Sequence, residues 1–209
     1  LPGIEVHAGR LDEADMEREL SGARIVVDAT HPFATLASGN IRAASLAVGA
    51  RCLRLARPVE ALPKGVVSVT SIACAARFLS ENPGRALLTT GSKELAPYTR
   101  LADYAERFFV RVLPLPGAIT KCIDAGFSPS HIIGMQGPFT RELNEAMLRQ
   151  VGAQWLVTKD SGTVGGTAEK IASARDVGAR CIVVARPAEG GGALSLMEVE
   201  DALLREFAR

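Results

Sequence analysis

Residues 48–58 read VGARCLRLARP and residues 177–187 read VGARCIVVARP, a repeat in which eight of eleven aligned positions are identical. Gly49 and Gly178 stand where a helix is expected to end, because glycine adopts the left-handed terminal conformation without strain. An apolar stretch typical of a strand follows, and Arg-Pro closes it. Each copy is preceded by a strand, a polar loop and a helix. We interpret the repeat as a duplicated Rossmann-like β-α-β unit; chance recurrence of a common turn is the alternative.

The rest of the chain alternates short β-branched stretches with Ala-rich amphipathic segments. Strands are predicted over residues 4–7, 25–28, 52–55, 66–69, 86–89, 108–112, 131–134, 155–158 and 181–185. Helices are predicted over residues 12–20, 33–48, 71–79, 94–104, 118–125, 139–151, 167–177 and 195–207, the last with a capping box from Ser195 to Glu198. Such alternation is typical of parallel sheets with helices on both faces, so the fold class is α/β.

We expect two Rossmann-like lobes with parallel sheets, residues 1–62 and residues 63–209, divided where Pro58, Pro63 and Gly65 interrupt the pattern. The last helix could pack on either lobe. The first lobe holds too few strands for a complete sheet and is predicted to lack an N-terminal strand-loop-helix unit. Two such lobes leave a crevice at the carboxyl ends of their strands, where ligands bind in open α/β sheets.

Composition excludes several classes of protein. The net charge of +1 gives no general attraction to nucleic acid or to anionic membranes. No stretch approaches the ~20 apolar residues of a membrane span, and no signal peptide opens the sequence, so a cytoplasmic location is expected. The four cysteines are neither paired at metal-ligand spacing nor close to a histidine, and we expect no metal site.

Two loops combine hydroxyls, glycines and lysines. Residues 89–94 (TTGSKE) follow an apolar strand and precede a predicted helix, whose free N–H groups and dipole favour an anion. Residues 158–166 (TKDSGTVGG) resemble the glycine-rich loops that hold phosphates through backbone amides, although they match no standard fingerprint. A capped helix start is the alternative for the first loop. The predicted cofactor-binding residues are Thr89, Thr90, Gly91, Ser92, Lys93, Thr158, Lys159, Ser161, Gly162, Gly165 and Gly166.

Two further loops carry candidate substrate contacts. In residues 28–33 (DATHPF), Thr30 can cap the next helix, and His31 either binds substrate or cofactor or is a locally bonded turn residue. In residues 134–140 (GMQGPFT), the Gln136 amide could bind a carboxamide or carboxylate, or the loop is a structural turn. The sequence shows no Ser-His-Asp order and no paired catalytic carboxylates.

In these loops the sequence resembles the precorrin-6A reductase family, including its cobalt-precorrin counterpart. The matching segments are VVDATHPFA, LRLARP, LLTTGSKEL, RVLP, IIGMQGPFT, LVTKDSG and VVARP, in the family's order from about Ala23 to Pro187. The resemblance implies an enzyme of two Rossmann-like lobes that uses NADPH to reduce one double bond of the precorrin-6A macrocycle, giving precorrin-6B. An oxidoreductase of another anionic substrate and a non-catalytic nucleotide-binding module are the alternatives.

The resemblance also implies roles for single residues. The tetrapyrrole substrate carries many carboxylates, around which basic residues are expected, since arginine pairs with carboxylates bidentately. We assign substrate binding to Thr30, Arg57, Gln136, Arg141 and Arg186. Solvated charges at the strand ends are the alternative for Arg57 and Arg186. His31 and Asp160 are candidate proton donors, with solvent as a third. We expect no nucleic acid or membrane partner, and contact with neighbouring pathway enzymes is possible.

The sequence departs from the family at its start. Members of the family usually begin with a strand, a Gly-Thr-rich loop and a helix before the equivalent of DATHPFA, and that loop is expected to help hold the dinucleotide. This chain begins LPGIEVHAG. We therefore expect the functional form to have ~40–50 further residues before Leu1, about the size of one β-α-β unit.

Overall fold

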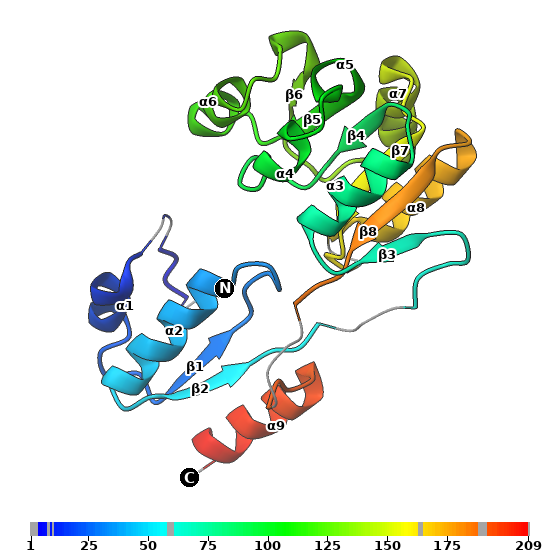
Figure 1. Ribbon diagram of the computed structural model, residues 1–209. Helices are drawn as coiled ribbons and strands as arrows, with labels where there is room; N and C mark the ends of the chain where they lie inside the picture. Colours follow the sequence, from blue (N-terminus) through cyan, green and yellow to red (C-terminus); the bar gives the residue numbers. More distant parts are fainter. Residues whose placement is uncertain are drawn as a thin grey trace. The chain divides into compact units, whose positions relative to one another are not determined.

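The computed structural model describes residues 4–7, 9, 11–57, 61–162, 165–187 and 192–208. The chain divides into two compact units, unit 1 with Leu1–Pro58 and Ala188–Arg209, and unit 2 with Val59–Pro187 (Figure 1). Both ends of the chain thus contribute to unit 1, and the last helix, α9 (Leu196–Phe207), belongs to it. No helix within the described ranges is long and apolar enough to cross a membrane.

Unit 2 contains a six-stranded sheet in the order β3-β8-β7-β4-β5-β6, with every pairing parallel. The strands are β3 (Val67–Val69), β4 (Ala86–Leu88), β5 (Phe108–Val112), β6 (Ile132–Gly134), β7 (Trp155–Lys159) and β8 (Arg180–Val184). From β4 the chain moves outward to β5 and β6, then continues on the other side of β4 with β7 and β8. The order reverses between β4 and β7, the position at which open α/β sheets bind ligands.

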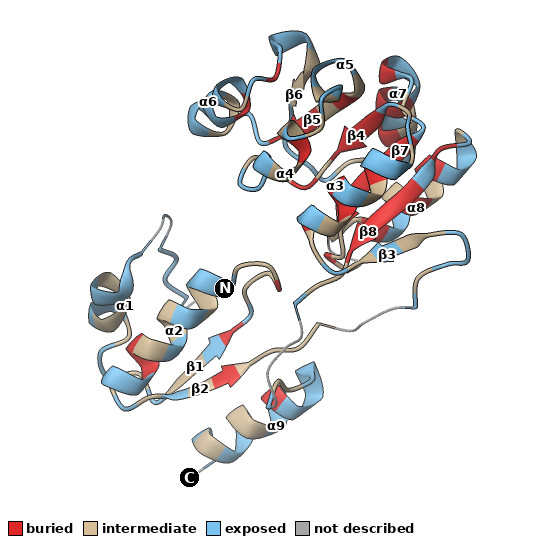
Figure 2. Cartoon of the chain, in the orientation of Figure 1, coloured by how far each residue is buried: buried red, intermediate tan, exposed pale blue. Residues whose placement is uncertain are grey.

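Helices cover both faces of this sheet, so its central strands are buried throughout and read as continuous apolar stretches (Figure 2). On one face, α3 (Ile72–Glu81) sets Phe78 edge-on to Trp155, with ring centroids 5.3 Å apart. On the other face, Leu148 of α7 (Arg141–Val151) and Ile171 of α8 (Thr167–Asp176) pack into one core cluster with the strands. The remaining helices of unit 2 are α4 (Ala96–Thr99), α5 (Tyr104–Arg107), α6 (Pro116–Asp124) and the 3-10 turn η1 (Pro129–His131).

Unit 1 contains a small parallel sheet of β1 (Ile25–Asp28) and β2 (Arg51–Arg54), with helices α1 (Glu13–Glu19), α2 (Thr35–Ala47) and α9. Leu194 extends the sheet through an isolated parallel bridge, donating from its N to the Arg54 O at 2.8 Å and accepting from the Ala56 N at 2.7 Å. The predicted capping box of Ser195 and Glu198 is confirmed at the start of α9. An ion pair of 2.6 Å between Arg24 and Glu206 joins the end of that helix to the rest of the unit.

The two copies of the sequence repeat form the same structure. Each is a strand, a helix and a second strand parallel to the first, β1-α2-β2 in unit 1 and β7-α8-β8 in unit 2. Gly49 and Gly178 end the helices with φ of 72° and 75°, as predicted. Ile25 pairs with Arg51 in the first copy, and Trp155 pairs with Arg180 in the second. The second copy therefore has one residue fewer between its two strands. The Pro58 end of the repeat lies outside the described residues.

Three predicted elements are wrong. Residues 4–7 form no strand. The helix expected over residues 94–104 is two short helices, α4 and α5, separated by turns. Pro97 lacks an N–H and fits only a first helical turn, so the helix cannot begin as early as residue 94. Helix α2 begins at Thr35 with Ala34 as its N-cap, so Thr30 does not cap it.

Candidate functional site

The two predicted anion loops lie on neighbouring strands of unit 2, at the point where the strand order reverses. Residues 89–94 follow β4 and residues 160–166 follow β7, and these two strands pair directly. Thr89 continues the pairing, because its N and Oγ1 both donate to the Val157 O, at 2.8 and 2.9 Å. Lys159 and Glu94 form an ion pair of 3.1 Å that ties one loop to the other. The structure therefore brings the predicted cofactor residues to one edge of the sheet.

The loop after β4 is open to solvent at its tip. Gly91 has φ of 84°, and a Cβ added there would meet nothing within 4 Å, so a ligand can approach the backbone closely. Lys93 is exposed and Ser92 is half-buried, whereas Thr90 is buried. The next helix, α4, spans only four residues. The expected contribution of a helix dipole at this loop is therefore wrong, and the groups that the loop can offer to an anion are Lys93 and the backbone of Gly91.

The loop after β7 uses its hydroxyls to hold its own shape. The Ser161 N donates to the Thr167 Oγ1 at 3.1 Å, and the two hydroxyls lie 3.1 Å apart. A Cβ on Gly165 would lie 1.8 Å from the Ser161 Oγ, so only glycine fits that position. Gly162 and Gly166 have φ of 68° and 66°, which glycine adopts without strain. Backbone amides, rather than the hydroxyls, are thus the groups that this loop can offer to a ligand.

Asp160 and Arg186 form a bidentate ion pair across the ends of β7 and β8. The guanidinium donates from Nε to Oδ2 at 2.9 Å and from Nη2 to Oδ1 at 3.0 Å, and the Gly162 N also donates to Oδ1 at 3.2 Å. The side chains are 17% and 8% exposed, so this pair is largely shielded from solvent. Such a pair stabilises the charged carboxylate. Asp160 is better placed to fix Arg186 and the loop than to donate a proton.

The predicted residues of unit 1 gather around Asp28, a buried carboxylate at the end of β1. It accepts from the Thr30 N and Oγ1, at 3.0 and 2.7 Å, and pairs with Arg54 at 2.9 Å. Burial raises the pKa of Asp28, but the hydrogen bonds from Thr30 and Ser38 and the charge of Arg54 outweigh burial and hold the pKa below its usual value. Thr30 therefore orders this network instead of capping a helix.

His31 and Arg57 lie beside that network. The His31 Nδ1 accepts from the Phe33 N at 3.3 Å, so a neutral His31 carries its proton on Nε2. The Arg57 Nη2 donates to the Ala29 O at 3.4 Å, reaching back to the loop that follows the paired strand. Arg186, at the matching position of the second copy, donates from its Nη2 to the Asp160 carboxylate, in the loop that follows β7. Equivalent positions of the two copies thus set an arginine over the loop between strand and helix.

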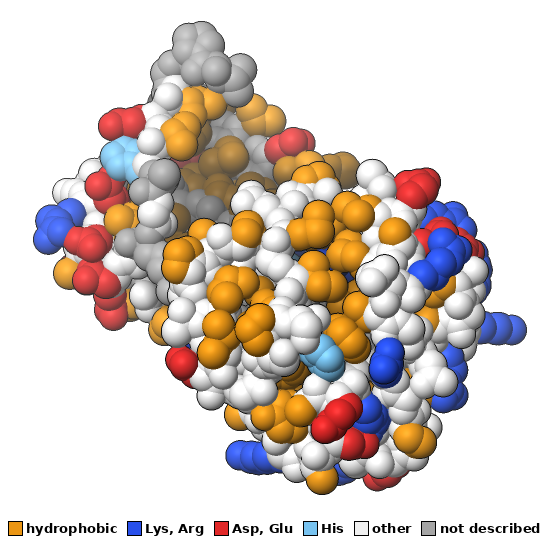
Figure 3. Space-filling model, turned by 90° about the horizontal axis from the view of Figure 1, so that it is seen from above, with side chains coloured by type: hydrophobic (Ala, Val, Ile, Leu, Met, Phe, Trp, Pro, Cys, Tyr) orange, Lys and Arg blue, Asp and Glu red, His pale blue; other side chains and the backbone are white. Residues whose placement is uncertain are grey.

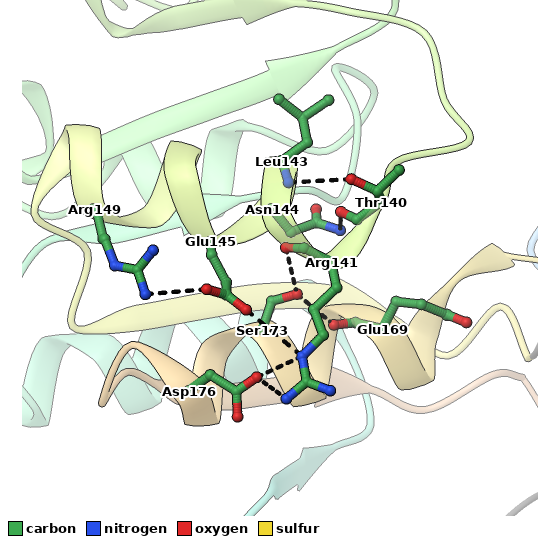
Figure 4. Close-up of polar contacts among 9 residues, drawn as sticks. All are labelled: Thr140, Arg141, Leu143, Asn144, Glu145, Arg149, Glu169, Ser173 and Asp176. Atoms are coloured by element: carbon green, nitrogen blue, oxygen red, sulfur yellow. Dashed lines mark hydrogen bonds and ion pairs between the residues drawn. The ribbon is translucent and has the colours of Figure 1, made fainter.

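Gln136 and Arg141 lie apart from the switch point, on the loop after β6 and at the start of α7. Gln136 is exposed. Arg141 lies between helices, pairing with Asp176 of α8 and, at 3.6 Å, with Glu145 of its own helix (Figure 4). The hydrogen bond to Asp176 and the negative charge of that carboxylate are the main reasons why the pKa of Arg141 is raised, and the charge of Glu145 adds to them. Arg141 joins α7 to α8 here, and its assignment to substrate binding remains a prediction.

Two basic residues of the interior were not predicted, Arg111, which is buried, and Lys170, which is half-buried. Arg111 lies in the middle of β5 and is only 6% exposed, and Lys170 lies in the second turn of α8. Burial lowers the pKa of Arg111 to about 10, and burial together with the charge of Arg111 lowers that of Lys170 to about 8. The signal in the sequence was a single charge inside the apolar stretch FFVRV.

Charge elsewhere is mixed. On the face drawn in Figure 3, acidic and basic side chains lie close together along the margin, as expected for a net charge of +1. In the part of the chain that the structure describes, no group of three or more His, Cys, Asp or Glu residues could hold a metal ion.

The family model for precorrin-6x reductase CbiJ/CobK matches residues 1–205. The chain is 41% identical to the cobalt-precorrin-6A reductase of Methanothermobacter thermautotrophicus, over 86% of this chain and 60% of that protein. It is 35% identical to the enzymes of the same name from Priestia megaterium, over 88% and 74% of the two chains, and Salmonella typhimurium, over 98% and 80%.

A solved structure, "CobK precorrin-6A reductase", matches with a TM-score of 0.71 and 25% identity, covering 93% of this chain and 79% of that one. The chain spans three fifths of the length of the Methanothermobacter relative. The match of the family model is nearly end to end, and the fold agrees with it. The chain belongs to the precorrin-6x reductase family.

Proposed function

We propose that the protein reduces one double bond of the precorrin-6A macrocycle, giving precorrin-6B in cobalamin biosynthesis. The family match over residues 1–205 is the observation that carries this proposal. The site supports it, because basic side chains and glycine backbone meet at the switch point of the unit 2 sheet. Such a site suits a ligand rich in phosphate or carboxylate groups.

The cobalt-bearing form of the substrate is favoured over the metal-free form. Relatives that are 33–41% identical to this chain are named cobalt-precorrin-6A reductase. Relatives named precorrin-6A reductase are 29% identical. Turnover of both substrates by one preparation would measure the preference.

A reductase of this family requires a reduced nicotinamide cofactor, and we propose NADPH. The residues present fit its phosphates in part. Gly91 leaves the backbone open, and Ser92 and Lys93 can donate to an anion. The loop after β7 adds the amide of Gly166, whereas the amides of Gly162 and Gly165 bond to the Asp160 Oδ1 and the Gly162 O. Ser161 and Thr167 are engaged with each other and position that loop. Thr158 is buried at the end of β7, where it supports the strand from which the loop leaves.

The nicotinamide supplies a hydride, so the protein must hold the substrate and provide a proton. His31 is the preferred proton donor, in its imidazolium form, because its contact with the Phe33 N holds the ring on the loop that follows β1. Asp160 holds Arg186 in place through two hydrogen bonds. We propose that Arg57, Arg186, Arg141 and Gln136 bind carboxylates of the macrocycle, with Thr30 ordering the loop that carries His31.

We further propose a cytoplasmic enzyme that takes its substrate from, and passes its product to, other enzymes of tetrapyrrole synthesis. The free cysteines, Cys52, Cys74, Cys122 and Cys181, suit a reducing compartment. Contact with a neighbouring enzyme would show as co-elution of the two purified proteins.

Absorbance at 340 nm tests the activity directly. Purified protein should oxidise NADPH only when precorrin-6A or its cobalt form is present. A matched reaction without tetrapyrrole is the control. Nucleotide binding without oxidation in the complete reaction would contradict a reductase and favour a non-catalytic nucleotide-binding module.

Lys93→Ala should weaken binding of NADPH or of tetrapyrrole by ~1–3 kcal/mol, the range for a charge-assisted contact. The ammonium is exposed beside the open backbone of Gly91, so its loss removes charge without disturbing the core. Lys64→Ala, at another exposed lysine of unit 2, is the matched control. Affinities measured by fluorescence titration that are equal in Lys93→Ala and the control would return residues 89–94 to a structural turn.

A further inference from the structure

A cavity of about 560 Å³ lies in unit 2 between the loop that follows β6 and the start of α8. Gly137, Phe139 and Asn144 line it from the β6–α7 side, and Gly165, Glu169 and Lys170 from the α8 side. Helices α7 and α8 pack side by side here, and Asn144 and Glu169 are drawn on them in Figure 4. The cavity shares Gly165 and Gly166 with the loop after β7, but Lys93 and Arg186 do not line it.

Lys170 provides a positive charge at the wall of this cavity. Its Nζ donates to the Gly165 O at 2.8 Å, a neutral acceptor. The ion pairs found among the described residues include none for Lys170. Burial, and the charge of Arg111, lower its pKa to about 8. A half-buried ammonium whose hydrogen-bond acceptor is neutral is costly, and such groups persist where a ligand supplies the missing charge.

Arg111 adds a second buried charge directly behind the wall. Its Nη1 donates to the Asn144 Oδ1 at 2.7 Å, and its guanidinium stacks over the Phe139 ring at 3.9 Å. Asn144 and Phe139 both line the cavity. Within the described ranges Arg111 has no carboxylate partner. Its contacts are thus a neutral amide, a thioether and an aromatic face, none of which offsets a full positive charge.

Helix α8 adds to the positive potential at the wall of the cavity. It is ten residues long, its N-cap Gly166 offers no side-chain cap, and its N-terminal end opens on the cavity. The free amides and the dipole of that end favour an anion. Glu169 is the acidic residue of the lining, and it is exposed to solvent, where its charge is screened. The balance at the wall is positive.

We propose that this cavity is a binding site for one oxyanionic group, a carboxylate or a phosphate, held by Lys170 and the amide of Gly166 over the buried charge of Arg111. Two sources share this chemistry, a side-chain carboxylate of the tetrapyrrole and a phosphate of the dinucleotide. The naming of these sources rests on the proposed function, whereas the binding of an oxyanion does not.

Inorganic sulfate is the probe for the site, because it keeps two negative charges from pH 6 to pH 10. In a titration of ¹⁵N-labelled protein, the amide signals of Gly137, Gly165 and Gly166 should shift together, at a constant ionic strength maintained with chloride. Gly91, in the loop after β4, reports binding elsewhere. Sulfate shifts that miss the three cavity glycines would overturn the proposal.

Lys170→Met should weaken sulfate binding about tenfold or more, the effect of removing a charge-assisted contact. Lys170→Arg keeps the charge and should bind within about threefold of the parent. Lys64→Met makes the same exchange at an exposed lysine and should leave binding unchanged. Equal affinities in Lys170→Met and Lys64→Met would contradict the site.

Binding should also depend on pH through Lys170. As the pH rises past about 8, the ammonium loses its proton and sulfate binding should weaken in the parent but not in Lys170→Arg. The other titratable groups against Lys170 are Arg111, Cys181 and Glu169. Burial raises the pKa of Cys181 to about 12, and that of Arg111 is about 10, so neither titrates first.

Affinities of the same variants for two larger ligands identify which molecule supplies the oxyanionic group. Loss of NADPH affinity alone in Lys170→Met assigns the site to a phosphate, and loss of affinity for uroporphyrin, a stable polycarboxylate tetrapyrrole, assigns it to a carboxylate. Both outcomes support the proposal, and neither requires turnover, so a failure of the proposed activity is distinguishable. Unchanged affinity for both ligands would mean an adventitious ion only and would overturn it.

Discussion

Replacing Lys170 by methionine should stabilise unit 2 by about 2 kcal/mol at pH 7. The pKa of Lys170 is lowered from 10.5 to about 8 in the folded protein, chiefly by burial. At 1.36 kcal/mol for each pKa unit, the buried charge costs about 3 kcal/mol below pH 8. Methionine removes this cost and loses the hydrogen bond to the Gly165 O, worth about 1 kcal/mol.

The gain should disappear at high pH. Between pH 8 and pH 10.5 the unfolded parent binds more protons than the folded parent, so the parent becomes more stable as the pH rises. The methionine variant has no such group and lacks this dependence. The advantage of the variant should therefore shrink from pH 8 and be gone by about pH 10.5.

Urea unfolding followed by tryptophan fluorescence measures the free energy of unfolding of unit 2. Trp155 is the single tryptophan of the chain and is 1% exposed in the core of that unit. Unfolding curves at pH 6.5 and pH 9.5 give the two ends of the effect. Lys64→Met, at the surface, should show no change at either pH. A Lys170→Met protein less stable than the parent at pH 6.5 would refute the idea of a costly buried charge.

The fold could be predicted where local pattern and local chemistry agree. Phe108–Val112 forms a strand with the predicted bounds, because β-branched and aromatic residues fill a position buried on both sides. Gly49 and Gly178 end their helices as predicted, because only glycine takes a positive φ there without strain. The parallel α/β class follows from these repeated units.

Long-range pairing could not be predicted in the same way. Leu194 pairs with Leu55, beside β2, although more than a hundred residues separate the two in the sequence. Unit 1 is therefore assembled from both ends of the chain. The segment around Tyr98 has a helical pattern, but it forms two short helices, in which Pro97 fits only the first turn of α4 and Tyr98 packs edge-on against Phe108. Tertiary packing overrides propensity in such segments.

The site shows the same division. Loops after strands were predicted from hydroxyls, glycines and lysines, and the topology places two of them together at the switch point. Which groups remain for a ligand could not be predicted, because Ser161 and Thr167 bond to each other. Arg111 and Lys170 were missed because charged side chains usually lie at the surface. Their burial follows only from the packing of α7 and α8.

Arg186→Met should destabilise unit 2 by about 3 kcal/mol or more, since it leaves the largely buried Asp160 carboxylate without its bidentate partner. The loop that follows β7 should also lose its anchor, because Asp160 holds the Gly162 N as well as the guanidinium. Unfolding monitored through Trp155 measures the loss, and titration with NADPH measures the effect on the loop. Arg149→Met is the matched control, because Arg149 is exposed and its ion pair with Glu145 should contribute little.

A second substitution distinguishes a lost partner from lost packing. In the double variant Asp160→Asn with Arg186→Met, the carboxylate that lost its arginine is gone, so about 1–2 kcal/mol of stability should return relative to Arg186→Met alone. Binding of NADPH should not return, because the amide cannot restore the bidentate contact that orders the loop. If the double variant is as unstable as the single one, Arg186 contributes through the packing of its stem, and the ion pair has no part in ordering the site.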